Sequence, residues 1–240
     1  MTDKIFWEYL EELPEQETAW RDWHQHLDGW YCFNTFYTHY LSVEGCRAKL
    51  LNCPSSCEQG CPRQVVENSP SDIAAVCTQN KADPILLKFR DILIYSLRHE
   101  DFHKAICVAM QIEQPLSKLS ECRKPWYLGE YSGTAVYLTY RMTELTETIS
   151  SLCLLLRQTP FILLAPTGRG MTLEAQELLA GNRSALLSME AELSLQSDGS
   201  FKPKRSIAES LKSRSNGCPQ GGTCKNLPIE TYKYLVYSEM

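Results

Sequence analysis

Apolar side chains recur at helical spacing through the first part of the chain. They lie three or four residues apart over residues 3–13 and again over 14–27, which predicts two amphipathic helices. Pro14 ends the first helix and suits the first turn of the second. The aromatic-rich stretch over 30–42 fits either a helix or a strand, with its rings in the core. We therefore expect a helical, aromatic-rich N-terminal segment over residues 1–45.

A hairpin pattern comes next. Residues 63–68 and 72–77 are two short β-prone runs joined by a Ser-Pro-Ser turn at 69–71. Beyond them, residues 100–112 return to helical spacing, which predicts another helix. The apolar face of this helix carries Phe102, Ile106 and Met110. We assign residues 46–120 to a cysteine-rich hairpin followed by a helix.

From residue 121 the pattern changes to that of an α/β fold. The expected elements are strands over 126–129, 135–140, 161–166 and 185–188 and helices over 142–157 and 173–180. Residues 161–166 are apolar throughout, as is typical of a strand buried on both faces. With the next helix and strand they form a β-α-β unit, whose strands run parallel. We predict an α+β fold with an α/β-like second half, in which residues 121–199 form a small mixed sheet with one such unit.

Composition narrows the class of protein. A chain of 240 residues with 43% hydrophobic and 22% charged residues can bury a core and is not globally disordered. No stretch of apolar residues is long enough to predict a membrane span. The first residues lack the apolar core of a signal peptide, so we expect a cytoplasmic protein.

Charge is distributed unevenly. The net charge of −5 argues against a protein whose whole surface binds nucleic acid. Residues 200–240 carry seven basic and three acidic side chains, a net charge of +4, which leaves −9 for residues 1–199. This segment is expected to be a basic tail that touches an anionic partner such as nucleic acid. The alternative is a solvated tail with no ligand.

The candidate metal site is a group of four cysteines. Cys53, Cys57 and Cys61 follow one another at intervals of four residues, and Cys77 closes the set across the hairpin. In a reducing compartment, such a cluster within a chain of 11 cysteines indicates a metal site more often than disulfides. Four thiolates suit a tetrahedral zinc ion with no open coordination position, which implies a structural role. An iron–sulfur cluster takes the same ligands, and separately packed thiols are the remaining alternative.

The same hairpin carries a resemblance. The string CPRQVVENSPSDIAAVC, over residues 61–77, resembles a cysteine hairpin in a family of uncharacterised bacterial proteins. In that family a C-P-x-R-V-V run followed by A-V-C precedes an α/β segment. PFILLAPTGRG, over residues 160–170, is similar to the same family, and the resemblance covers about residues 50–195. It implies a fold of this order and no established activity.

A second candidate metal site is the string His-Glu-Asp-Phe-His at residues 99–103. On a helix, His99 and His103 lie one turn apart with Glu100 as a general base, which is the arrangement of a zinc metallopeptidase. The charged neighbours do not suit a helix beneath a cleft, and no third ligand is apparent. Acidic residues in a first helical turn are also explained by the helix dipole.

A glycine-containing loop follows the apolar strand and precedes a helix, a layout that can hold phosphate with backbone N–H groups. The candidate phosphate-binding residues are Thr167, Gly168, Arg169, Gly170 and Thr172. Arg169 could add a charge-assisted contact. The loop matches neither a Walker A loop nor G-x-G-x-x-G, and the alternative is a plain turn with a glycine in the left-handed region. A nuclease-like core would need Glu-x-Lys after Glu130, and that is absent.

Together these features predict a non-enzymatic metal-binding interaction or scaffold protein, with a structural zinc ion, a protein partner and contact to nucleic acid through residues 200–240. The first alternative is a nucleotide- or nucleic-acid-acting α/β enzyme, active or degenerate, that uses the 167–172 loop. The second alternative is a zinc metallopeptidase.

Overall fold

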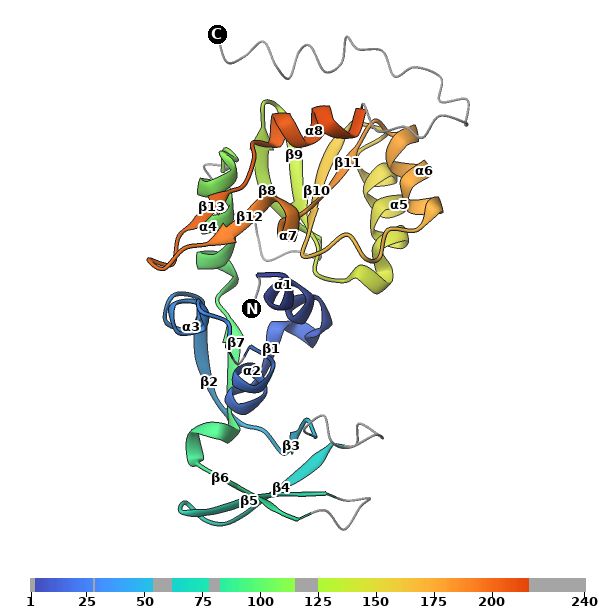
Figure 1. Cartoon of the computed structure of the whole chain (residues 1–240). Coiled ribbons are helices and arrows are strands. Elements are labelled where there is room, and N and C mark those ends of the chain that lie inside the picture. Colours follow the sequence, from blue (N-terminus) through green and yellow to red (C-terminus); the bar gives the residue numbers. More distant parts are fainter. Residues whose placement is uncertain (1–2, 28, 54–61, 78–82, 115–124, 216–240) are drawn as a thin grey trace. The chain divides into compact units, whose positions relative to one another are not determined.

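A computed structural model divides the chain into two compact units, Met1–Phe102 and His103–Met240 (Figure 1). It describes residues 3–27, 29–53, 62–77, 83–114 and 125–215. Helices and several small sheets alternate along the chain, which confirms the α+β class. None of the helices in the described part of the chain is long and apolar enough to cross a membrane.

Three helices and an aromatic core build the start of the first unit. The helices are α1 (Asp3–Glu12), α2 (Trp20–His26) and α3 (Phe33–Tyr40). Phe6 lies at the centre of the core, stacked on Trp30 at 4.5 Å and edge-on to Phe36 at 4.7 Å between ring centroids. Such offset and edge-on pairs add to the stability that aromatic burial itself provides.

The second predicted helix begins later than expected. Residues Pro14–Gln16 form a single 3-10 turn (η1), and Glu17–Ala19 form strand β1. Glu15 and Gln16 adopt φ angles of 52° and 54°, which turns the chain away from a helix. Strand β1 then pairs antiparallel with β7 (Leu93–Leu97). Pairing with a distant strand has overridden the local apolar spacing.

The first unit contains two sheets. Strand β2 (Leu41–Arg47) completes the order β1-β7-β2. The second sheet, antiparallel throughout, has the order β3-β4-β5-β6, with bounds Leu50–Leu51, Arg63–Ser69, Asp72–Cys77 and Ile85–Leu87. We call it the hairpin sheet, because β4 and β5 are the predicted hairpin. A 3-10 turn, η2 (Phe89–Ile92), leads from it to β7.

The inner face of the hairpin sheet packs on a small apolar cluster. Its buried members are Ala19, Ala48, Leu51, Ile73, Ala75, Leu87 and Ile92. Three of the seven are alanines, so the apolar area that this sheet buries is modest for its size.

The second unit is built on a four-stranded sheet. Helix α4 (His99–Met110) leads into it, and the strands are β8 (Trp126–Tyr131), β9 (Thr134–Leu138), β10 (Phe161–Ala165) and β11 (Ala185–Ser188). The order is β11-β10-β9-β8, with β9, β10 and β11 parallel and β8 antiparallel to β9. The unit therefore contains two successive β-α-β crossovers where the sequence predicted one.

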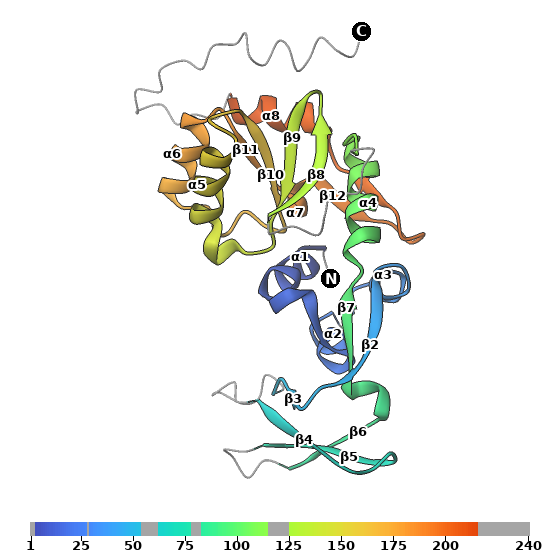
Figure 2. The same cartoon turned by 180° about the vertical axis from the view of Figure 1, so that it is seen from behind.

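Two helices cover one face of this sheet (Figure 2). After the 3-10 turn η3 (Met142–Glu144), helix α5 (Leu145–Leu155) packs beside α6 (Leu173–Gly181). Every residue of β10 is buried, which agrees with its continuous apolar run.

The predicted basic tail needs correction over its first part. Strand β13 (Phe201–Pro203) pairs with β12 (Leu193–Leu195), and α8 (Ile207–Ser215) follows. Phe201, Ile207 and Leu211 of this segment are buried, so apolar side chains among the basic ones draw it into the fold. The rest of the predicted tail, residues 216–240, lies outside the described residues.

Candidate functional site

Strand register brings two of the four candidate cysteines to one end of the hairpin sheet. Leu51 of β3 lies opposite Arg63 of β4, and Arg63 lies opposite Cys77 of β5. Cys53 follows Leu51 by two residues, and Cys77 is the last residue of β5. The end of β3, the start of β4 and the end of β5 therefore meet at the same edge (Figure 1). Cys57 and Cys61 lie outside the described residues.

A buried cation accompanies this end of the sheet. Arg63 is buried, and its Nη1 donates to the carbonyl oxygens of Asp83 at 2.8 Å and Ala75 at 3.4 Å. Because Arg63 and Cys77 are direct cross-strand neighbours on the inward face, their β-carbons are about 5 Å apart. The positive charge suits a neighbouring thiolate.

The cysteine spacing alone gave no reason to include Arg63. Its signal is the alternation of the strand, since it shares the parity of Val65 and faces inward with it. A charged residue at an inward position of a short strand marks a place where burial serves a polar contact.

The other described cysteines behave differently. Cys32, Cys107 and Cys153 are buried, and burial raises the pKa of each thiol. A raised pKa keeps the thiol protonated, which suits a packing residue rather than a ligand. Within the described ranges, which exclude Cys57 and Cys61, no three His, Cys, Asp or Glu side chains come together as a metal site.

The His-Glu-Asp-Phe-His string opens α4, as predicted, with His99 and His103 one turn apart and Glu100 between them. The Nε2 atom of His103 lies 3.1 Å from the hydroxyl of Tyr140, and its ring packs edge-on to Trp126 at 5.2 Å. The aromatic surroundings account for His103 without a metal. The metallopeptidase alternative gains no third ligand among the described residues.

The loop between β10 and α6 uses its hydroxyl groups locally. Thr167 is buried, and its Oγ1 accepts the backbone N–H of Arg169 at 3.2 Å. Thr172 is the N-cap of α6, because its Oγ1 accepts the N–H of Ala175 at 3.1 Å. One of the free N–H groups that a phosphate would use at this helix end is therefore taken by the chain itself.

Neither glycine of this loop lies in the left-handed region, contrary to the turn that we expected. Gly170 has a different reason to be glycine, because a β-carbon there would lie 2.7 Å from the backbone oxygen of Met142. Gly168 has open space around it. These contacts describe a tightly packed βα turn. Phosphate binding by this loop stays a prediction.

No protein-family model matches the chain, and neither a curated protein nor a solved structure matches it. The likeness of residues 61–77 to the bacterial cysteine hairpin therefore stays a resemblance, and the functional argument rests on the geometry above.

Proposed function

We propose that this chain is a non-enzymatic metal-binding scaffold protein, in which a zinc ion held by Cys53, Cys57, Cys61 and Cys77 clamps the end of the hairpin sheet. The observation that carries the proposal is the register of β3, β4 and β5, which brings Cys53 and Cys77 to one end. The other two cysteines lie on the short connection from β3 to β4. A cytoplasmic location, where thiols stay reduced, belongs to the proposal.

The charge of the site supports a tetrathiolate ion. Four thiolates around Zn²⁺ carry a net charge of −2, which is costly to bury without a counter-charge. Arg63, buried opposite Cys77, supplies one positive charge at this end of the sheet. Four protein ligands leave no open position on the metal, which is why we assign it a structural role.

The size of the hairpin sheet gives the metal a task. Strand β3 has two residues and β6 has three, and an isolated two-stranded hairpin is marginally stable at best. The small, alanine-rich cluster beneath the sheet adds little. A structural metal would supply the missing folding free energy.

The outer face of the hairpin sheet supports an interaction role. Leu50, Val66 and Leu86 project from it and are exposed. An apolar sheet face of this kind is common on proteins that bind other proteins. Nucleic-acid contact through residues 200–240 remains part of the proposal, and it predicts binding that weakens with salt and is lost on truncation after Ser215.

The first experiment is metal content, with an absorption spectrum, on protein purified without oxygen. One zinc ion per chain is expected, lost in a C57S/C61S double variant together with thermal stability. C46S is the matched control, because Cys46 is exposed on β2 and outside the candidate set. Iron with visible absorption would indicate a cluster, and zinc that depends on His99 and His103 would indicate the peptidase. A protein without metal whose melting is unchanged by chelation would refute the proposal.

A further inference from the structure

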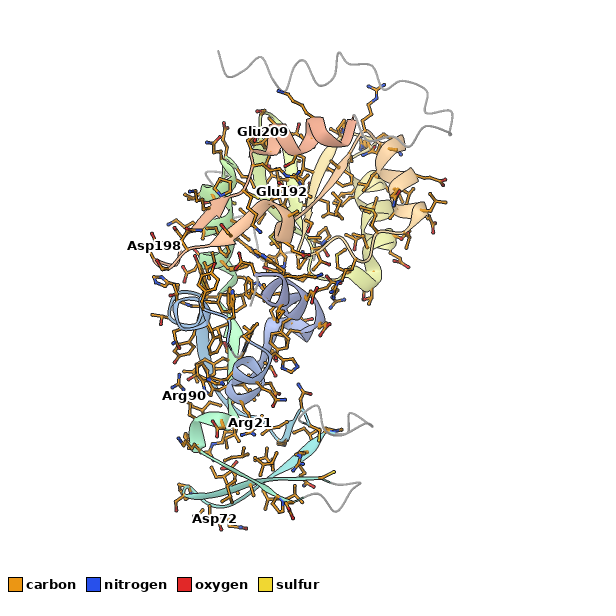
Figure 3. All side chains as sticks on the ribbon, viewed as in Figure 1. Arg21, Asp72, Arg90, Glu192, Asp198 and Glu209 are labelled. Atoms are coloured by element: carbon orange, nitrogen blue, oxygen red, sulfur yellow. The ribbon has the colours of Figure 1, made fainter. Side chains whose placement is uncertain are left out.

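A buried carboxylate in α2 holds the chain at the point where it leaves β3. Asp22 is only 3% exposed, and it follows Arg21, labelled in Figure 3. The Oγ1 of Thr18 donates to its Oδ2 at 3.2 Å, and the backbone N–H of Asn52 donates to its Oδ1 at 3.3 Å. Asn52 stands between β3 and Cys53. The carboxylate therefore ties α2 to the residue before the first proposed metal ligand.

The surroundings of this carboxylate are apolar. Burial raises the pKa of Asp22, and it outweighs the hydrogen bonds from Asn52 and Thr18, which act in the opposite direction. Tyr9 lies close by, stacked on His26 at 4.3 Å between ring centroids. Burial, and next the charge of Asp22, raise the pKa of the Tyr9 phenol, so it stays neutral beside the carboxyl group.

A buried carboxyl group without a role would be replaced at little cost by an apolar residue on the same helix face. Its hydrogen bonds indicate the role. In apolar surroundings a hydrogen bond is electrostatically stronger than in water, so the bond to the Asn52 amide holds the backbone well. One residue further on, that backbone presents the sulfur of Cys53.

We propose that Asp22 is a positioning residue for the metal site, which fixes the backbone at Asn52 so that Cys53 is held in place for the ion. The inference rests on the proposed zinc site and adds to it a residue that does not touch the metal. Partners that orient metal ligands in this indirect way change metal affinity by about 10- to 100-fold when they are lost.

The test is a titration of the full-length protein with Co²⁺ under nitrogen, followed by the thiolate-to-cobalt absorption. D22A removes the acceptor and is expected to weaken Co²⁺ binding by about tenfold or more. D22N keeps an acceptor oxygen for the Asn52 amide and is expected to bind within about threefold of the wild type. T18V is the matched control, because it removes the other hydrogen bond of the carboxylate and leaves the one to Asn52.

Cobalt affinity in D22A equal to that of the wild type would overturn the inference, and so would an equal loss in T18V, which would indicate general loosening of the helix. A wild-type protein that binds no Co²⁺ would instead overturn the proposed function. Hydrogen exchange at the Asn52 amide needs no variant and covers the case in which D22A fails to fold. Slow exchange in the metal-free protein is expected, and exchange at the rate of an open chain would overturn the inference.

Discussion

The second unit contains a buried acid whose charge is met by a single arginine, and removing that arginine is expected to be costly. Glu192 of α7 (Met189–Glu192), labelled in Figure 3, is 1% exposed. The Nε and Nη2 of Arg205 donate to its two oxygens at 2.9 and 2.8 Å, and the Oγ of Ser210 donates at 2.5 Å. This clamp ties the strand end after β11 to the segment that leads into α8.

The size of the effect follows from the burial of the two partners. Removing one partner of a fully buried ion pair costs about 3–5 kcal/mol, because the other charge is left uncompensated. The side chain of Arg205 is itself 40% exposed, so water can approach Glu192 once the guanidinium is gone. The hydroxyl of Ser210 also remains. We therefore expect R205A to lower the free energy of unfolding by about 2 kcal/mol.

The assay is urea unfolding followed by far-UV circular dichroism, with R141A as the matched control. Arg141 and Glu144 form the same kind of pair at 3.2 Å, but their side chains are 45% and 56% exposed. An exposed pair of this kind contributes about 0.5 kcal/mol. The double variant E192Q/R205A should regain part of the loss, because the uncompensated charge is removed. The reasoning is refuted if R205A is no more destabilised than R141A, or if the double variant regains nothing.

Three further results are expected from the same unfolding assay. G170A should lose about 2 kcal/mol, since its new β-carbon would overlap a backbone oxygen, whereas G168A has room and should unfold like the wild type; equal effects would contradict the packing argument. R90A should lose about 1 kcal/mol because the guanidinium of Arg90 lies 3.7 Å from the ring centroid of Trp20, and R90K should retain part of it. Because burial raises the folded-state pKa of Asp22 above its ordinary 3.8, its contribution to stability is present below that value and is lost as pH rises through the raised pKa. The stability of D22N relative to the wild type should therefore increase from about pH 4 to about pH 7, and a constant difference would contradict the assignment.

The candidate site shows how far sequence reasoning reaches. The spacing of the cysteines and the alternation of residues 63–77 predicted a hairpin with thiols at its base, because strand alternation is a local property. Neither Arg63 nor Asp22 could be assigned in the same way. Arg63 acts through oxygens on β5 and before β6, and Asp22 acts on an amide thirty residues further along the chain.

The sequence by itself determined the elements whose apolar residues repeat within one segment. The apolar run of β10, helices α5 and α6 and strand β11 were all expected close to where they lie, because their burial depends on a period of two or 3.6 residues. Tertiary structure alone decided that Glu17–Ala19 is a strand and that residues 201–215 belong to the fold. These segments take their conformation from distant partners, since backbone hydrogen bonds and buried apolar contacts between segments outweigh weak local preferences.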